Sequence, residues 1–343
     1  MPRIFVICER DVGLFSLIEQ VVANVPRALA LGYRPVVYFG RNCCYWVPEG
    51  YRGRDNVWEY YFEPLVEGLD GSSLPAHAVE RLQTLLFPLE DTRSVGLELD
   101  CDTYLSNHFG DEPSLWGLAL RIPCASFDPG RRVRGKAARI IRRFVRPRSY
   151  LMENAERFHR GELEGAPVIG VHIRGTDIVA RFRGGVVELP RYRAAIASEL
   201  ARRPEARILV ATDDERSLSF VRDAFGDRVV SYATVLHRSG DATGAGPTGA
   251  RLPRYIADDP RAAALNGEEA VTEYLLLRRS DVLVHNGASL ARTVLLAEPE
   301  MPHRNVRAPK AKNLLDLVRK RDLRGKYYEW IVHGPVDLDR LGI

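Results

Sequence analysis

Apolar residues in the first 40 positions form two short uninterrupted runs separated by an amphipathic segment. Residues 3–8 make the first run, residues 15–32 carry apolar positions at helical spacing up to a glycine, and residues 35–40 make the second run. A strand, a helix and a strand in this order are typical of a doubly wound α/β layer. Residues 3–40 are therefore predicted to open such a layer.

The same alternation is clearer beyond Gly165. Four apolar runs alternate with four amphipathic segments, which predicts a second, parallel sheet with helices on its faces. The predicted strands are 166–173, 206–212, 228–232 and 281–286, and the predicted helices are 190–203, 214–226, 267–280 and 289–298.

Three segments interrupt this pattern. Residues 40–75 are rich in aromatic residues broken by Pro and Gly, which indicates an insertion that either packs in the core or stacks on ring faces of a ligand. Residues 130–148 are strongly basic with spaced apolar positions, and are predicted to form an amphipathic helix with a charged outer face. Residues 239–259 are rich in glycine and are predicted to be a surface loop without regular structure.

Length and composition narrow the class of protein. A chain of 343 residues favours two domains. Its 49 basic and 45 acidic residues leave a net charge of +4. This charge attracts polyanions only weakly, so nucleic acid is not the expected partner. The five cysteines are an odd number without CxxC spacing, which argues against a disulfide framework or a zinc site. No apolar run approaches the ~20 residues of a membrane span, so we expect a cytoplasmic protein.

Candidate chemistry lies after the predicted strands, where ligands of open α/β sheets bind. Arg174 follows the first strand of the second sheet, and its planar guanidinium matches two phosphate oxygens, with Asp177 placed to orient it. The sequence NGAS, with Gly287 and Ser289, opens the last predicted helix and would present backbone N–H groups to an anion. Together these groups would stabilise a diphosphate leaving group without a metal ion.

Three motifs in the second half carry a family resemblance. The segment 168–177, VIGVHIRGTD, resembles the HxRxxD motif of the fucosyltransferase superfamily that includes α-1,6-fucosyltransferases, the nodulation fucosyltransferase and protein O-fucosyltransferases. The segment ILVATDD resembles the second motif of that superfamily. The segment TEYLLLRRSDVLVHNGASLAR resembles the third, with Glu273 eight positions before Asp281.

The resemblance implies a GT-B fold, in which two Rossmann-like domains face each other across a cleft. On this basis residues 1–160 would bind the acceptor, residues 161–305 would bind the nucleotide sugar, and residues 306–343 would form a helical tail that packs back toward the first domain. The implied reaction is an inverting, metal-independent transfer of a fucose-like sugar from a GDP-sugar to a hydroxyl of a glycan, protein or small molecule, with no other cofactor.

The resemblance also implies a role for each matching residue. Arg174 would contact the β-phosphate, His172 and Glu273 the nucleoside, and Ser289 the phosphates. Three aspartates would support the site: Asp177, Asp213 and Asp214.

Other interpretations of these residues stay open. Asp213 and Asp214 also suit the N-cap of the following helix. The family often has Asp where this chain has Glu273, and relatives commonly have aromatic and serine residues where this chain has HNGAS. An ADP- or UDP-linked sugar is an alternative donor. A non-catalytic module that binds a nucleotide sugar or a glycan is an alternative of another class.

Two further sets of carboxylates are candidates for other roles. Glu9 and Asp11 follow the first strand, and either would serve as the base that accepts the proton of the acceptor hydroxyl. The DxD pattern of Asp100 and Asp102 is the metal-binding signature of another glycosyltransferase class, but so short a pattern arises readily by chance.

Overall fold

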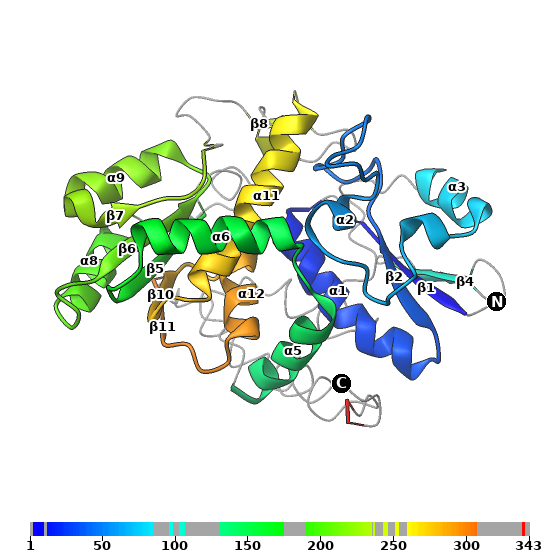
Figure 1. The fold of residues 1–343 in the computed structure, drawn as a ribbon, viewed down its shortest axis with the longest axis horizontal. Coiled ribbons are helices and arrows are strands. Elements are labelled where there is room, and N and C mark those ends of the chain that lie inside the picture. Colours follow the sequence, from blue (N-terminus) through cyan, green and yellow to red (C-terminus); the bar gives the residue numbers. More distant parts are fainter. Residues whose placement is uncertain are drawn as a thin grey trace, which may run out of the picture.

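The computed structural model describes residues 3–9, 12–84, 96–98, 103–106, 131–174, 189–234, 236, 243–245, 251–253, 259–306 and 338–339. Four residues of the sequence predictions lie outside this part of the chain: Asp11, Asp100, Asp102 and Asp177. Within it, the chain forms two larger sheets and a two-stranded one, with helices between and around the larger sheets (Figure 1), which confirms the α/β class. The domain boundaries at 160 and 305 and the facing cleft stay predictions.

The first sheet has the strand order β2-β1-β4-β3. Its strands are β1 Ile4–Cys8, β2 Arg34–Tyr38, β3 Gly96–Glu98 and β4 Thr103–Ser106. Strand β1 pairs in parallel with β2 and β4, whereas β3 is antiparallel to β4. Helix α1, Leu14–Ala30, connects β1 to β2 as predicted, and Gly32, with a left-handed φ of 76°, follows its end. The winding changes direction at β1, so ligand-facing residues are expected just after it.

The second sheet is wholly parallel and has the order β11-β10-β5-β6-β7. Its strands are β5 Val168–Ile173, β6 Arg207–Thr212, β7 Val229–Val230, β10 Val282–His285 and β11 His303–Asn305. The four predicted strands are confirmed and β11 is an additional one. The chain winds outward from β5 to β7 and returns to the other side of β5 at β10. Its switch point is therefore between β5 and β10, where open α/β sheets bind ligands.

Helices cover both faces of the second sheet. Helices α8 Leu189–Leu200 and α9 Glu215–Phe225 share one core cluster with the β5 residues Val171 and Ile173. Helices α11 Pro260–Leu277 and α12 Ser289–Ala297 belong to the larger cluster on the other face. Alternation along the strand thus turns His172 away from Val171 and Ile173, toward the face covered by α11 and α12.

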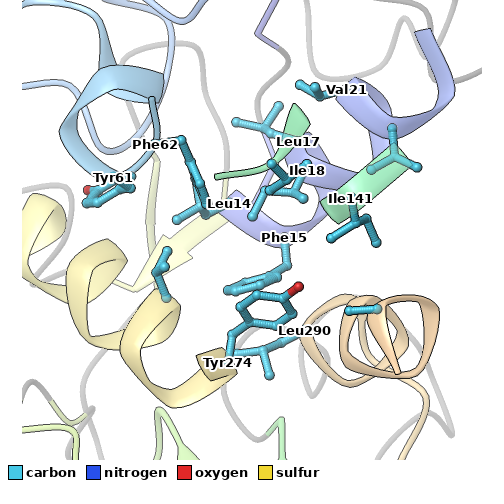
Figure 2. Close-up of a cluster of buried hydrophobic side chains, with 14 of the residues drawn as sticks. Leu14, Phe15, Leu17, Ile18, Val21, Tyr61, Phe62, Ile141, Tyr274 and Leu290 are labelled. Atoms are coloured by element: carbon cyan, nitrogen blue, oxygen red, sulfur yellow. The ribbon is translucent and has the colours of Figure 1, made fainter. Parts of the chain in front are cut away.

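The larger cluster continues from the second sheet into the first. It includes residues of α1, α2 Val57–Tyr61, α5 Arg131–Phe144 and α6 Ser149–Glu162 as well as α11 and α12. Figure 2 shows the part of the cluster where α1, α2, α5, α11 and α12 meet. The aromatic side chains of Trp58, Tyr60, Tyr61 and Phe62 are buried within it, so core packing accounts for this part of the aromatic segment. The predicted basic helix is α5, whose buried face includes Ile140, Ile141 and Phe144.

The predicted absence of regular structure in residues 239–259 is wrong. Strands β8 Thr243–Ala245 and β9 Arg251–Pro253 pair antiparallel within that segment. Ladder hydrogen bonds come from the backbone, so three-residue strands can pair without a periodic side-chain pattern. The remaining elements are α3 Ala76–Thr84 and the 3-10 turns η1 Gly71–Ser73 and η2 Gly226–Arg228.

Three described residues belong to the predicted C-terminal tail, residues 306–343: Val306, Leu338 and Asp339. Val306 is buried in the core cluster that α8 and α9 share. Leu338 is buried in the larger core cluster, and Asp339 forms an ion pair with Arg139 of α5 at 2.5 Å. The predicted tail helix itself lies outside the described residues. No helix in the described part of the chain has both the length and the apolar character to cross a membrane.

Candidate functional site

Arg174 and Asp213 form the charged centre of the candidate site. Arg174 directly follows β5 and Asp213 directly follows the neighbouring strand β6, so parallel pairing brings them to the same edge of the sheet. The Arg174 Nη1 lies 2.9 Å from the Asp213 Oδ2. The Arg174 side chain keeps 32% of its surface exposed, whereas Asp213 keeps 13%. Asp213 thus orients a guanidinium that is partly exposed at the edge of the sheet.

His172 and Glu273 lie beside this pair, and each has a buried polar atom without a partner in the part of the chain that the structure describes. His172 is 6% exposed and its Nδ1 is unpartnered among the described residues. Burial lowers the pKa of His172 to about 4, although the charge of Asp213 works in the opposite direction, so the ring is neutral near pH 7. Its backbone carbonyl accepts a hydrogen bond from the Tyr192 hydroxyl at 3.1 Å.

Glu273 reaches the same region from α11. It is 5% exposed, and its Oε1 has no partner in the described part of the chain. Burial raises the pKa of Glu273 well above its usual range, and the charges of Glu269 and Asp213 add to the shift. A backbone hydrogen bond from Ala233 reaches the Glu273 carboxyl, which leaves one buried carboxyl oxygen unpaired among the described residues. That oxygen and the unpaired imidazole nitrogen of His172 are costly to bury without a ligand, so both are suited to the polar edge of a nucleoside.

The turn from β10 into α12 supplies the second part of the site. Gly287 has a left-handed φ of 79°, which favours glycine. Its N–H donates to the His285 Nδ1 at 3.0 Å, and the Ala288 N–H donates to the Asn286 Oδ1 at 3.3 Å. These two backbone groups, expected to be free, are therefore taken by neighbouring side chains. The helix amides that lack an intrahelical acceptor begin at Ser289.

Arg292 connects this turn to α1. Its Nη1 donates to the Gly287 carbonyl at 2.9 Å and its Nη2 to the Ser289 hydroxyl at 3.0 Å. The same guanidinium holds Glu19 of α1 through two bonds, at 2.9 Å and 2.7 Å. The hydroxyls of Ser16 and Ser289 are 2.9 Å apart, so the first turns of α1 and α12 meet. The N-terminal end of α1, from the first half of the chain, and that of α12, from the second half, thus lie next to each other.

Glu9 lies at the switch point of the first sheet, directly after β1. It is 3% exposed, and burial raises its pKa to about 7 while hydrogen bonds from the backbone of Gly40 and Asn42 oppose the shift. The residues that follow β2 lie between Glu9 and Arg174. Burial raises the pKa of Cys43, and Cys43 is close enough to Glu9 for the Glu9 charge to raise it further. Burial also raises the pKa of Tyr45, and Tyr45 is close enough to Arg174 for the Arg174 charge to lower this pKa against the larger effect of burial. A carboxyl with a pKa near neutrality suits a general base.

The structure brings together four of the predicted residues and separates the roles of others. His172, Arg174, Asp213 and Glu273 form one group at the edge of the second sheet. Asp214 is the N-cap of α9, where it accepts the Ser217 N–H at 3.0 Å, as the alternative interpretation held.

Sequence reasoning missed four residues that hold the site: Ser16, Glu19, His285 and Arg292. The spacing of Arg292 three positions after Ser289, on one helix face, was an available signal. The contacts of Glu19 and Ser16 span 273 residues and have no local signature.

Comparison with known proteins gives similarity of fold. No family model matches the sequence, and no curated protein matches it significantly. POFUT1, solved in complex with GDP, superposes with a TM-score of 0.50 and 13% identity over 89% of this chain and 99% of that one.

Two structures of NodZ are similar at a lower score. The α-1,6-fucosyltransferase NodZ soaked with GDP-fucose gives a TM-score of 0.48 at 18% identity, covering 87% of this chain and 93% of that one. Fucosyltransferase NodZ from Bradyrhizobium gives 0.49 at 16% identity, covering 86% and 92%. The chain therefore shares its fold with POFUT1, for which the TM-score is 0.50.

Proposed function

We propose that this protein is a glycosyltransferase that transfers a fucose-like sugar from a GDP-sugar to a hydroxyl acceptor. The observation that carries the proposal is the group at the β5/β10 switch point. There, the guanidinium that Asp213 orients and the opening turn of α12 lie at the same edge of the sheet as two buried polar atoms, the Nδ1 of His172 and the Oε1 of Glu273, which have no partner among the described residues. A diphosphate and a nucleoside need these two kinds of partner side by side.

GDP is the proposed nucleotide for two reasons. The fold is shared with POFUT1, which is solved in complex with GDP. A guanine ring also presents N–H donors along one edge, and the Glu273 carboxyl has an oxygen available to accept them. Fucose is the proposed sugar because the three motifs in the second half of the sequence resemble those of the fucosyltransferase superfamily.

In the proposed reaction an acceptor oxygen attacks the anomeric carbon of the donor. The bond from that carbon to the β-phosphate oxygen breaks, GDP leaves with the electron pair, and the configuration at carbon inverts. Arg174 and the first amides of α12 stabilise the negative charge on the leaving diphosphate. Glu9 accepts the proton of the acceptor hydroxyl, and Asp11, in the same loop, is the alternative base.

The donor is tested by thermal-shift titration with GDP, ADP and UDP. We expect GDP to raise the melting temperature most, and a response to ADP or UDP alone contradicts the proposed donor. Slow hydrolysis of GDP-fucose without acceptor is expected of an enzyme. A binding module would show no hydrolysis even at saturating donor.

The proposed chemistry requires no metal ion. Arg174 and the α12 amides supply the positive charge that a divalent cation supplies in other transferases. Hydrolysis of GDP-fucose is therefore expected to continue in the presence of a chelator. Loss of activity on chelation, restored by a divalent cation, would make Asp100 and Asp102 the candidates for its ligands.

A further inference from the structure

His285 lies where the second sheet meets the turn from Gly287 to Ser289 at the start of α12. We call this turn the diphosphate seat, because the proposed reaction places the phosphates of the donor there. It is the last residue of β10, two positions before Gly287, and it is 1% exposed. It pairs in register with His172 of β5, so both side chains face the side of the sheet covered by α11 and α12. Nothing in the proposed reaction uses it.

The hydrogen bonds of His285 fix its protonation. Its Nδ1 accepts the Gly287 N–H at 3.0 Å, so that nitrogen carries no proton. The Nε2 lies 3.1 Å from the His303 Nδ1, and with the proton on Nε2 it donates to that atom. Each ring nitrogen thus has one partner, and the ring is a neutral link between β11 and the turn.

Gly287 is held from both sides as a result. Its N–H is bonded to His285 and its carbonyl to the Arg292 Nη1 at 2.9 Å. Both hydrogen bonds act on a residue whose left-handed backbone sets the direction in which α12 begins. The orientation of the Ser289 amide and hydroxyl depends on that direction.

We infer that His285 is a positioning residue for the diphosphate seat, acting through its bond to the Gly287 N–H. This rests on the proposed function, since the seat is the site of the donor's phosphates. It assigns to the histidine of the HNGAS turn a role in donor binding without contact to the donor. Preorganised donors bind an anion more tightly than donors that must be ordered on binding.

The test compares two substitutions of the same residue. His285→Phe keeps a planar ring but removes both nitrogens, whereas in His285→Asn the side-chain oxygen can accept the amide two residues on, as in an Asx turn. We expect His285→Phe to raise the Kd for GDP at least about tenfold, and His285→Asn to keep it within about threefold of wild type. His77→Phe on the exposed surface of α3 is the matched control and should leave GDP affinity unchanged.

A second measurement tests how firmly the turn is held when no nucleotide is bound. Amide hydrogen exchange at Gly287 should be at least about tenfold faster in His285→Phe than in wild type, and close to wild type in His285→Asn. Equal GDP affinity in wild type and His285→Phe, even with a lowered melting temperature, overturns the inference while the proposed function stands. If wild type binds no nucleoside diphosphate at all, the proposed function fails with it.

Discussion

At Arg174 the ion pair with Asp213 sets how the side chain is presented. Asp213 holds the Arg174 Nη1 at 2.9 Å while the Arg174 side chain keeps 32% of its surface exposed, which is the geometry expected of a phosphate clamp. Arg174→Ala is expected to remove about 2 to 4 kcal/mol of transition-state stabilisation and so to lower kcat/KM for GDP-fucose, with the fold retained. Steady-state kinetics and circular dichroism measure the two effects.

The control for this change is Arg160→Ala on α6, where an exposed arginine pairs with Glu156 at 3.6 Å. It should leave kcat/KM unchanged, because such surface pairs contribute little. A loss of less than tenfold in Arg174→Ala would show that the leaving group is stabilised elsewhere.

At Glu9 the pKa predicts a dependence on pH. Burial raises this pKa to about 7, so the carboxyl is protonated below that pH and cannot accept a proton. The rate of sugar transfer should therefore rise as pH increases through about 7 and level off above it. Glu9→Gln should lower the rate by about 100-fold or more and remove this step from the pH profile.

Glu67→Gln, at an exposed position of the same half, serves as the control and should keep the full profile. A wild-type step at pH 7 that persists in Glu9→Gln would assign the titrating base to another residue, with Asp11 the next to substitute.

At the scale of elements, α11 approaches the aromatic segment so closely that only glycine fits at one position. A Cβ on Gly267 would lie 2.3 Å from the Tyr61 hydroxyl, which itself donates to the Ala264 carbonyl at 2.8 Å. Gly267→Ala should therefore destabilise the protein by about 1 to 3 kcal/mol, although alanine is the better helix former. Urea unfolding measures the change.

Two further variants isolate the cause. Gly135→Ala on α5 introduces a Cβ with no atom within 4 Å and should be neutral or stabilising by up to about 1 kcal/mol. Combining Gly267→Ala with Tyr61→Phe removes the clashing oxygen and should recover part of the loss. Equal effects of the two glycine substitutions would mean that α11 has room to shift.

The sequence predicted those elements whose apolar positions repeat regularly. Strands β1, β2, β5, β6 and β10 are short apolar runs, and each was located within a few residues. Helix α6 was not predicted, and its buried residues are Leu151 and Ala155, too few for a periodic signal. Strand β11 is three half-buried residues whose identity as a strand depends on pairing with β10.

The candidate site was predictable to the same extent. Arg174 and Ser289 could be identified because each follows a predicted strand. The pairing of Arg174 with Asp213 instead depends on the adjacency of β5 and β6, and the bond from Gly287 to His285 depends on the orientation of one ring. Contacts that arise from strand order and side-chain orientation leave no periodic pattern in the sequence.

At the scale of the whole molecule, a buried ion pair joins the two sheets through their helices. Arg292 of α12 and Glu19 of α1 are bonded in a bidentate manner, with side-chain exposures of 16% and 1%. A buried carboxylate without its partner is strongly unfavourable, so Arg292→Met should lower the free energy of unfolding by about 3 to 5 kcal/mol. The double variant with Glu19→Gln should lose less than the sum of the single changes, because neither charge is then left unpaired.

Arg279→Met provides the comparison, since Arg279 of the second half pairs with Glu156 at 2.7 Å with exposures of 41% and 45%. An exposed pair of this kind contributes about 0 to 1 kcal/mol, and its loss should be small. Ser16 of α1 is hydrogen-bonded to the Ser289 hydroxyl of α12. Loss of the ion pair between Arg292 and Glu19 should therefore also loosen the first turn of α12. Arg292→Met is therefore expected to speed amide exchange in the first turns of both α1 and α12, whereas exchange confined to α12 would show that the two helices are not coupled through this pair.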